Sequence, residues 1–277
     1  MHIAVIGLGL IGGSFAKAIK AKTFHTVCGM DRSAAVLNQA LAYGAIDEAA
    51  DGGFSRCDIV LLALYPGDTA AFLERHIADF KPGSLVVDLC GVKRFVCGRA
   101  KELFAGSKAV FIGGHPMAGK ESSGFVNSTD RLFDGASMIL TPFAGTPDEA
   151  VEQAGGFFRS VGFGRITITT AEHHDEVVAF TSQLAHILSS AYIQCPAAGQ
   201  HTGFSAGSFQ DLTRVAKLNE NMWTELFLHN KDFLAAQLDD LIRMLVRYRD
   251  VIAGGEQDAL CNMLRDGRIL KERLGSN

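Results

Sequence analysis

A glycine-rich turn near the N-terminus is the feature that most constrains how this chain can fold. The apolar residues 2–6 lead directly into Gly-Leu-Gly-Leu-Ile-Gly at positions 7–12, and residues 14–21 then have the pattern of a helix. A GxGxxG sequence between a strand and a helix is typical of domains that bind a dinucleotide. The context, rather than the glycines alone, makes the pattern specific.

Each glycine of this turn has a separate physical role. Gly7 allows the tight turn, Gly9 lets the backbone approach a pyrophosphate, and Gly12 lets the helix pack closely on the strand. The N-terminus of the helix that this turn opens offers free N–H groups and a partial positive charge to the phosphates, and Leu10 and Ile11 lie just before it within the turn. These five residues are therefore predicted to bind the cofactor.

A carboxylate stands where the second predicted strand ends. Asp31 follows the apolar residues 26–30, and such a residue accepts hydrogen bonds from the ribose hydroxyls and repels a 2′-phosphate, which favours NAD over NADP. The neighbouring Arg32 could meet a phosphate, so NADP stays open. The alternative is that the glycines only make a turn and that Asp31 only caps a helix. Ala63 and Leu64, which end the third predicted strand, are expected to border the dinucleotide because ligands lie beyond the carboxyl ends of parallel strands.

Strand and helix patterns alternate over the first 170 residues. The predicted strands are residues 2–6, 26–30, 58–64, 84–88, 109–112, 137–140 and 165–169. Several of them are continuously apolar, as in parallel strands covered on both faces. This alternation predicts a Rossmann-type, doubly wound α/β sheet.

After Thr170 the pattern is helical, with almost no strand signal. We therefore predict a nucleotide-binding domain over residues 1–170 and an all-helical domain over residues 171–277. Long apolar helices need a partner surface. The helical domain is expected either to pair with a second copy, forming a homodimer, or to bury its own apolar faces; the periodicity alone does not decide between the two.

Composition excludes several other classes. A formal net charge of −4, with no run of Lys or Arg, argues against nucleic acid as a partner. No apolar run approaches the roughly 20 residues of a membrane helix, and the N-terminus lacks the pattern of a signal peptide. The six cysteines form neither a CxxC pair nor a disulfide framework, which favours the cytoplasm and predicts no metal site.

A histidine follows the fifth predicted strand. His115 begins the sequence His-Pro-Met-Ala-Gly-Lys-Glu and would lie near a bound nicotinamide. An imidazole there can accept the proton of an alcohol while hydride leaves. A structural role for a histidine before a proline is the alternative.

Two further groups of polar residues lie in the helical region. Asp175, Ser182, His186 and Ser189 form a narrow stripe on one predicted helix, either at a site or as a solvated face. In the segment Asp-Leu-Thr-Arg-Val-Ala, Arg214 could hold a carboxylate and Asp211 could orient it, unless the two form an ordinary surface pair.

These segments, in this order behind the glycine turn, resemble the prephenate dehydrogenase/arogenate dehydrogenase family over essentially the whole chain. The resemblance implies a helical dimerisation domain, an active site between the domains, and NAD-dependent oxidative decarboxylation of prephenate on the route to tyrosine, or of arogenate. It implies that His115 is the catalytic histidine, that His186 contacts the substrate and that Arg214 binds a substrate carboxylate. Glu121 then lies at the cleft entrance, and Asp211 and Trp223 support the pocket.

The chain departs from the family pattern at one position. The family has Asp-x-Gly-Ser-x-Lys after the fourth strand, whereas this chain has Asp-Leu-Cys-Gly-Val-Lys at 88–93. Gly91 thus replaces the serine, while Lys93 is kept, either as a substrate-binding residue or as a surface lysine. Two rival interpretations are a 3-hydroxyacid dehydrogenase that uses Lys217, and a non-catalytic NAD(H) sensor; neither explains the His-Pro segment together with Arg214.

Overall fold

The first part of the chain forms a single twisted sheet of the doubly wound kind. A computed structural model describes residues 1–50 and 52–275. The strands are β1 (His2–Ile6), β2 (Thr26–Met30), β3 (Glu48–Ala49), β4 (Ile59–Leu62), β5 (Leu85–Asp88), β6 (Val110–Pro116), β7 (Ser137–Pro142) and β8 (Arg165–Ile168). Their order is β3-β2-β1-β4-β5-β6-β7-β8, and the pairs are parallel apart from β6 with β7. The predicted fold class is confirmed.

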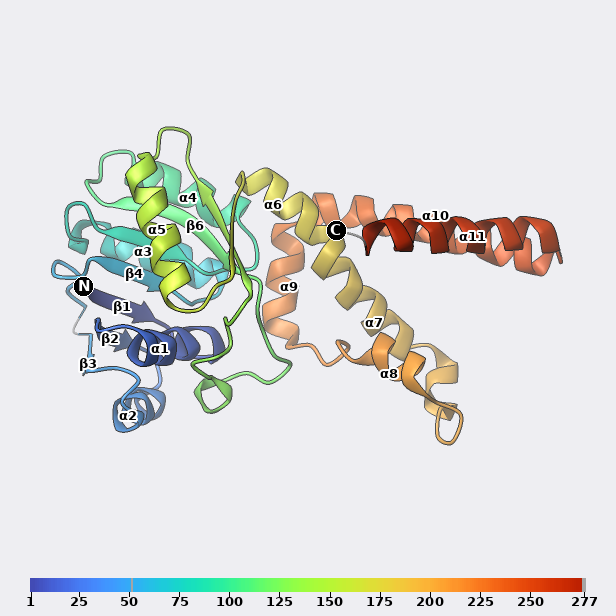
Figure 1. Cartoon of the computed structure of the whole chain (residues 1–277), viewed down its shortest axis with the longest axis horizontal. Coiled ribbons are helices and arrows are strands. Elements are labelled where there is room, and N and C mark those ends of the chain that lie inside the picture. Colours follow the sequence, from blue (N-terminus) through green and yellow to red (C-terminus); the bar gives the residue numbers. More distant parts are fainter. Residues whose placement is uncertain (51, 276–277) are drawn as a thin grey trace. The chain divides into compact units, whose positions relative to one another are not determined.

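Helices cover both faces of this sheet (Figure 1). They are α1 (Leu10–Lys22), α2 (Ala34–Tyr43), α3 (Pro66–His76), α4 (Arg94–Phe104) and α5 (Asp148–Ser160). Phe15 of α1 and Phe158 of α5 belong to the hydrophobic core on one face, and Phe72 of α3 and Phe104 of α4 belong to the core on the other. Alternate residues of each central strand enter these two cores, which is why the strands read as continuous apolar runs.

The strands differ from the sequence prediction in detail. The short strand β3 was not predicted, because its two residues are exposed and carry no apolar signal. Strand β6 runs on to Pro116, and His115 pairs with Ile139 of β7. His115 therefore lies within the end of a strand instead of in a loop, because the antiparallel partner extends the hydrogen-bonded ladder.

The chain is helical from Ala171 onward within the described residues. The segments are α6 (Ala171–Val178), the π-helix η3 (Ala179–Leu184), α7 (Ala185–Ile193), the 3₁₀ turn η4 (Pro196–Gln200), α8 (Gly207–Thr213), α9 (Glu220–His229), α10 (Lys231–Ala253) and α11 (Gln257–Leu274). Two short 3₁₀ turns, η1 (Ile77–Asp79) and η2 (Phe125–Asn127), interrupt the first part. None of the helices described here has the length and apolar character to cross a membrane.

The chain forms two compact units, Met1–Asn230 and Lys231–Asn277. The first unit contains the sheet together with α6, α7, α8 and α9, and the second consists of α10 and α11. Secondary structure changes near residue 170, but helix α6 remains attached to the sheet layer through Asp175, and α9 through a hydrogen bond from the Gly67 N–H to Glu225 Oε1. The residues of the candidate site lie within the first unit.

Candidate active site

The glycine turn after β1 has the shape that a dinucleotide requires. Gly7 has a φ of 84°, and a Cβ atom there would lie 2.5 Å from the carbonyl oxygen of Ala63. A Cβ on Gly12 would lie 1.8 Å from the carbonyl oxygen of Gly7. Gly9, in contrast, faces open space, and it starts α1 without a side-chain cap. The crowded positions build the turn, while the open one leaves room for a pyrophosphate at the helix N-terminus.

Asp31 stabilises the same turn. Its carboxylate accepts hydrogen bonds from the backbone N–H groups of Leu8 and Ser33, each at 2.8 Å. Helix α2 is capped by the Ser33 side chain, which accepts from Val36 N, so capping is not the role of Asp31. The carboxylate thus lies between β2 and the glycine turn, where a ribose would bind, and Arg32 beside it is exposed.

Ala63 and Leu64 adjoin the turn as predicted, but outside the strand. Strand β4 ends at Leu62, and the backbone N–H of Ala63 still donates to Ile6 O at 2.8 Å. The Leu64 side chain lies 2.9 Å from where a Cβ of Gly7 would be. Two features of this sheet edge therefore suit a dinucleotide: the open space at Gly9 and the Asp31 carboxylate at the end of β2.

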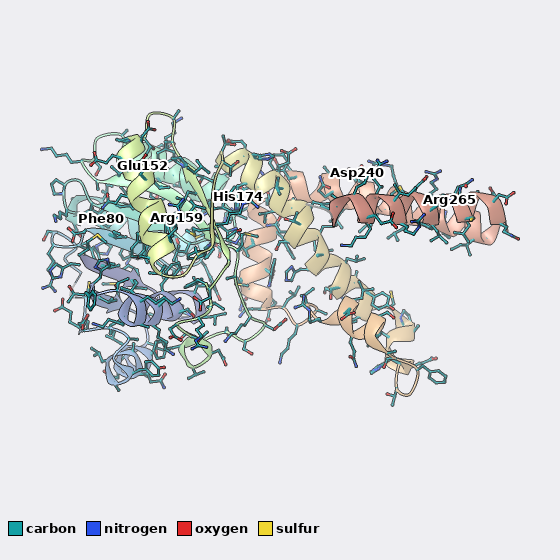
Figure 2. The ribbon with its side chains drawn as sticks, in the orientation of Figure 1. Phe80, Glu152, Arg159, His174, Asp240 and Arg265 are labelled. Atoms are coloured by element: carbon teal, nitrogen blue, oxygen red, sulfur yellow. The ribbon has the colours of Figure 1, made fainter. Side chains whose placement is uncertain are left out.

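A chain of hydrogen bonds runs from His115 into the protein. The Nδ1 atom of His115 lies 2.8 Å from Nε2 of His174, and Nδ1 of His174 lies 2.7 Å from a carboxylate oxygen of Asp175. His174 lies near the start of α6, where this helix leaves the sheet layer (Figure 2). His174 and Asp175 are 2% and 0% exposed, whereas His115 is partly exposed.

The hydrogen bonds fix which nitrogen atoms carry protons. Burial opposes the charge of Asp175, but hydrogen bonds from His174 and from the Arg94 and Lys93 backbone N–H groups lower its pKa, so it is a carboxylate and accepts from His174 Nδ1. Nε2 of neutral His174 then accepts from His115 Nδ1. This leaves the Nε2 atom of His115 with a free lone pair.

The electrostatic surroundings keep both imidazoles neutral. Burial, then His174 and Lys93, hold the pKa of His115 well below its ordinary value of 6.5. Burial also lowers the pKa of His174, against the opposing effect of Asp175. A neutral imidazole with an accessible lone pair can act as a general base.

Lys93 is the centre of a buried network and is not on the surface. Its ammonium group is fully buried and forms an ion pair with Asp88, and it donates a hydrogen bond to Gly114 O at 2.6 Å. Asp88 raises the pKa of Lys93 against the opposing effect of burial. The alternative of a surface lysine is wrong. The buried ammonium favours a role in fixing the backbone before His115 over the predicted contact with a substrate.

Asp175 also joins α6 to α4. Its carboxylate oxygens accept the backbone N–H groups of Lys93 and Arg94 at 2.7 and 2.9 Å, at the N-terminus of α4. Asn230 Nδ2 donates to the Asp175 carbonyl oxygen and to Gln183 Oε1, each at 2.8 Å. The helical region is therefore attached to the sheet layer next to His115 by a hydrogen-bonded polar cluster.

Gly91 lies between Leu226 and the Nε2 atom of His115. A Cβ at this position would lie 3.9 Å from His115 Nε2 and 3.3 Å from a methyl group of Leu226. The serine that the family pattern would supply thus belongs beside the free lone pair. Without that serine, position 91 places no side chain against the lone pair.

The helical region supplies a second imidazole. The ring of His186 stacks on Trp223 with centroids 4.0 Å apart, and its Nδ1 donates to Ser182 O at 2.8 Å. The polar stripe predicted on this helix is no solvated face, because Asp175 and Ser189 are 0% and 1% exposed. The π-helix η3 widens the helix between these residues, a feature that often occurs at functional sites.

Arg214 pairs with Glu121. Their guanidinium and carboxylate groups are 2.8 Å apart, and both side chains are about half exposed or more, at 66% and 49%. Between the described residues Asp211 and Arg214 we find no hydrogen bond or ion pair, so the orienting role predicted for Asp211 stays a prediction. The acid that contacts the arginine comes instead from the loop after His115.

The structure brings several of the predicted site residues close to one another. Glu121 follows His115 in one loop and reaches Arg214, while Leu226, three residues after Trp223 on α9, lies against Gly91 and hence beside His115. His174 was not predicted at all. Its only sequence signal is its place beside Asp175 in the His-His-Asp run at 173–175.

The fold and the glycine turn define an oxidoreductase with a nucleotide-binding domain. Family models named "Prephenate dehydrogenase, nucleotide-binding domain" and "Prephenate dehydrogenase, dimerization domain" match residues 15–167 and 170–266. The chain belongs to the prephenate dehydrogenase family.

Named relatives and solved structures agree with this assignment. The cyclohexadienyl dehydrogenase of Zymomonas mobilis is 32% identical over 99% of this chain and 95% of its own length. The prephenate dehydrogenase of Bacillus subtilis is 31% identical over 98% of this chain and 74% of its own. The Aquifex aeolicus prephenate dehydrogenase, solved with hydroxyphenyl propionate and NAD+, has a TM-score of 0.86 at 25% identity and covers 99% of this chain and 98% of that one. Synechocystis arogenate dehydrogenase has a TM-score of 0.84 at 27% identity over 99% of both chains.

Proposed function

We propose that this chain is an NAD-dependent prephenate dehydrogenase that oxidises and decarboxylates prephenate to 4-hydroxyphenylpyruvate. The observation that carries the proposal is the free lone pair on His115 Nε2, which the Asp175–His174 chain orients and Gly91 leaves uncovered. A hydroxyl group placed there loses its proton to His115 as the carbon beneath it is oxidised.

The glycine turn and Asp31 would hold the cofactor, with Ala63 and Leu64 beside it. The bound nicotinamide supplies the hydride acceptor. His115 takes the hydroxyl proton and becomes an imidazolium, whose charge is stabilised through His174 by the Asp175 carboxylate. Release of the ring carboxylate as CO2 then makes the ring aromatic, so that the step does not reverse, and the phenolate oxygen that forms takes the proton back from His115.

Arg214 is proposed to bind a substrate carboxylate in place of Glu121. A guanidinium with its side chain 66% exposed is free to exchange one carboxylate partner for another. His186, held by Trp223 and Ser182 O, is proposed as a second contact of the dicarboxylate substrate. Lys93 is proposed to position His115 through Gly114 and not to contact the substrate.

Arogenate dehydrogenase is a second candidate activity, because the relatives include a cyclohexadienyl and an arogenate dehydrogenase. The test is to incubate the purified protein with prephenate or arogenate, each with NAD+ or NADP+, and to follow absorbance of the reduced nicotinamide. Prephenate with NAD+ is expected to give the highest kcat/KM. A preference for arogenate would establish the second candidate, and no turnover in any of the four mixtures would refute both.

We further propose a homodimer in the cytoplasm. The dimerization-domain model covers residues 170–266, and α10 and α11 carry exposed apolar side chains, among them Ile242, Leu245, Ile252 and Leu270, each at least half exposed. The cysteine pattern, without a disulfide framework, fits a reducing compartment. Sedimentation of the pure protein at the mass of a monomer would contradict the dimer.

A further inference from the structure

A buried lysine on the cofactor-binding helix binds the loop that carries Glu121. Lys17 of α1 is 7% exposed, and its ammonium group donates to Ser128 O at 3.0 Å. The same group lies 4.2 Å from the ring centroid of Tyr43 and 4.4 Å from that of Phe125, whose rings meet edge to face. A cation between two aromatic rings is a specific and favourable arrangement.

Neighbouring residues on the same side of α1 hold the same segment. The Ser14 hydroxyl accepts from Thr129 N at 3.1 Å. A Cβ on Gly13 would lie 2.8 Å from Phe125 and 2.9 Å from the Ser128 hydroxyl, so the segment packs directly on the helix backbone. Residues 125–129 are thus fixed to α1 by Gly13, Ser14 and Lys17 together.

This attachment has a consequence for the candidate site. The loop that leaves β6 after His115 carries Glu121, four residues before Phe125, and Glu121 pairs with Arg214. An exposed ion pair of this kind is weak by itself, so its geometry depends on how firmly the loop is held. The anchor for that loop is on α1, whose N-terminus faces the pyrophosphate site.

We propose that Lys17 is a positioning residue, which fastens residues 125–129 to helix α1 and thereby holds Glu121 against Arg214. The inference rests on the proposed function, in which a substrate carboxylate must displace Glu121 from Arg214. A firmly held Glu121 competes with that carboxylate. Loosening the loop therefore favours substrate binding, whereas general damage to the fold does not.

The test is a double-mutant cycle between Lys17→Met and Glu121→Gln, with KM for prephenate as the readout. Each single change is expected to lower KM by about two- to fivefold with kcat nearly unchanged. An exposed ion pair between Glu121 and Arg214 can weaken substrate binding by up to about that factor. The double variant is expected to show no more than the larger single effect, since both changes release the same arginine. Lys17→Arg, which keeps a cation between the rings, is expected to restore the wild-type KM.

Two controls separate positioning from stability. Lys20→Met removes a charge from the same helix, where Lys20 pairs with Asp47, and is expected to leave KM unchanged. Tyr43→Ala keeps Lys17 but removes one ring that is 67% exposed, and is expected to give a smaller shift in the same direction. Hydrogen exchange of residues 121–129 is expected to be faster in Lys17→Met.

The outcomes distinguish this inference from the proposed function. If the wild-type protein turns over neither acid, the proposed function fails; faster exchange of residues 121–129 in Lys17→Met would still support the anchor. If the wild type is active but Lys17→Met changes only thermal stability, or adds fully to Glu121→Gln, the positioning role is overturned.

Discussion

The imidazoles of His115 and His174 share a hydrogen bond of 2.8 Å, and the second of them is held by the carboxylate of Asp175. His115 therefore presents one fixed nitrogen to the open side of the site. In serine proteases a buried carboxylate likewise accepts a hydrogen bond from the catalytic histidine and fixes the orientation of its ring.

Replacement of His174 by Phe is expected to lower kcat while KM changes little. The ring shape is kept, but His115 Nδ1 loses its acceptor, and the imidazolium formed in the reaction loses its link to Asp175. The loss is expected to approach the roughly 10²–10⁴-fold effect of the general base itself, which His115→Asn measures. His173→Phe is the matched control, because His173 is exposed and pairs only with Glu176 within the described contacts. Equal kcat values for the two phenylalanine variants would contradict the role of His174.

The pH dependence of kcat/KM is expected to have its acid limb below pH 6.5. Burial, His174 and Lys93 lower the pKa of His115, so its basic form persists below the ordinary range of histidine. At pH values below the pKa of His115, kcat/KM is expected to fall about tenfold per pH unit. A profile measured with saturating cofactor checks this, and a limb centred above 6.5 would contradict it.

The same shift predicts how stability depends on pH. His115 and His174 have lower pKa values in the folded protein than in the unfolded chain, so the unfolded chain binds more protons. Their contribution to stability is present above about pH 6.5, the ordinary value, and is lost as pH falls below it. Urea unfolding at pH 7.5 and 5.5 is expected to give the lower free energy at pH 5.5, with a smaller difference in the His174→Phe variant.

Lys93→Met is expected to destabilise the protein by about 3–5 kcal/mol, because it leaves the buried carboxylate of Asp88 without its cation. Met has nearly the length of Lys, so packing is largely kept. The double variant with Asp88→Asn removes both charges and is expected to recover part of the loss. Thermal and urea unfolding measure this. A single variant as stable as wild type, with a raised KM, would instead support contact between Lys93 and the substrate.

The sequence predicts the fold well because its signals are local. Continuous apolar strands and the glycine turn depend on neighbours in the chain, and both are confirmed. The network around His115 depends on contacts between distant segments. His174 is 59 positions away, and only its place next to Asp175 distinguishes it in the sequence from the exposed His173. Lys93 illustrates the same limit, because its burial is decided by Asp88 and Gly114 together, and a lysine is rarely buried without such partners.

Arg214→Ala is expected to raise KM for prephenate by about 10- to 100-fold with a small change in kcat. A hydrogen bond to a charged group contributes roughly 1.5–3 kcal/mol, and binding by Arg214 is present in both the ground state and the transition state. The side chain is exposed, so the fold should be unaffected. Steady-state kinetics provide the measurement, with Arg243→Ala on α10, whose exposed side chain pairs with Asp240, as the control. An unchanged KM would remove Arg214 from the site.

Gly91 offers a test of whether the space beside His115 must stay open. A Cβ at this position would lie 3.9 Å from His115 Nε2 and 3.3 Å from a Leu226 methyl group, which must move by a few tenths of an ångström to make room. Gly91→Ser is expected to fold and to change kcat/KM by less than about tenfold, because its hydroxyl can share a hydrogen bond of about 1 kcal/mol with Nε2.

Gly91→Val fills the same space with methyl groups that offer no hydrogen bond, so the substrate hydroxyl cannot reach Nε2. Its kcat/KM is expected to fall by about 10²-fold or more, since the contribution of the general base is lost. Leu226→Ala in the same protein opens room on the other side of position 91 and is expected to restore part of the activity. Equal activity of the Ser and Val variants would mean that the substrate does not approach His115 from the side of Gly91, and the proposed geometry of proton transfer would have to be abandoned.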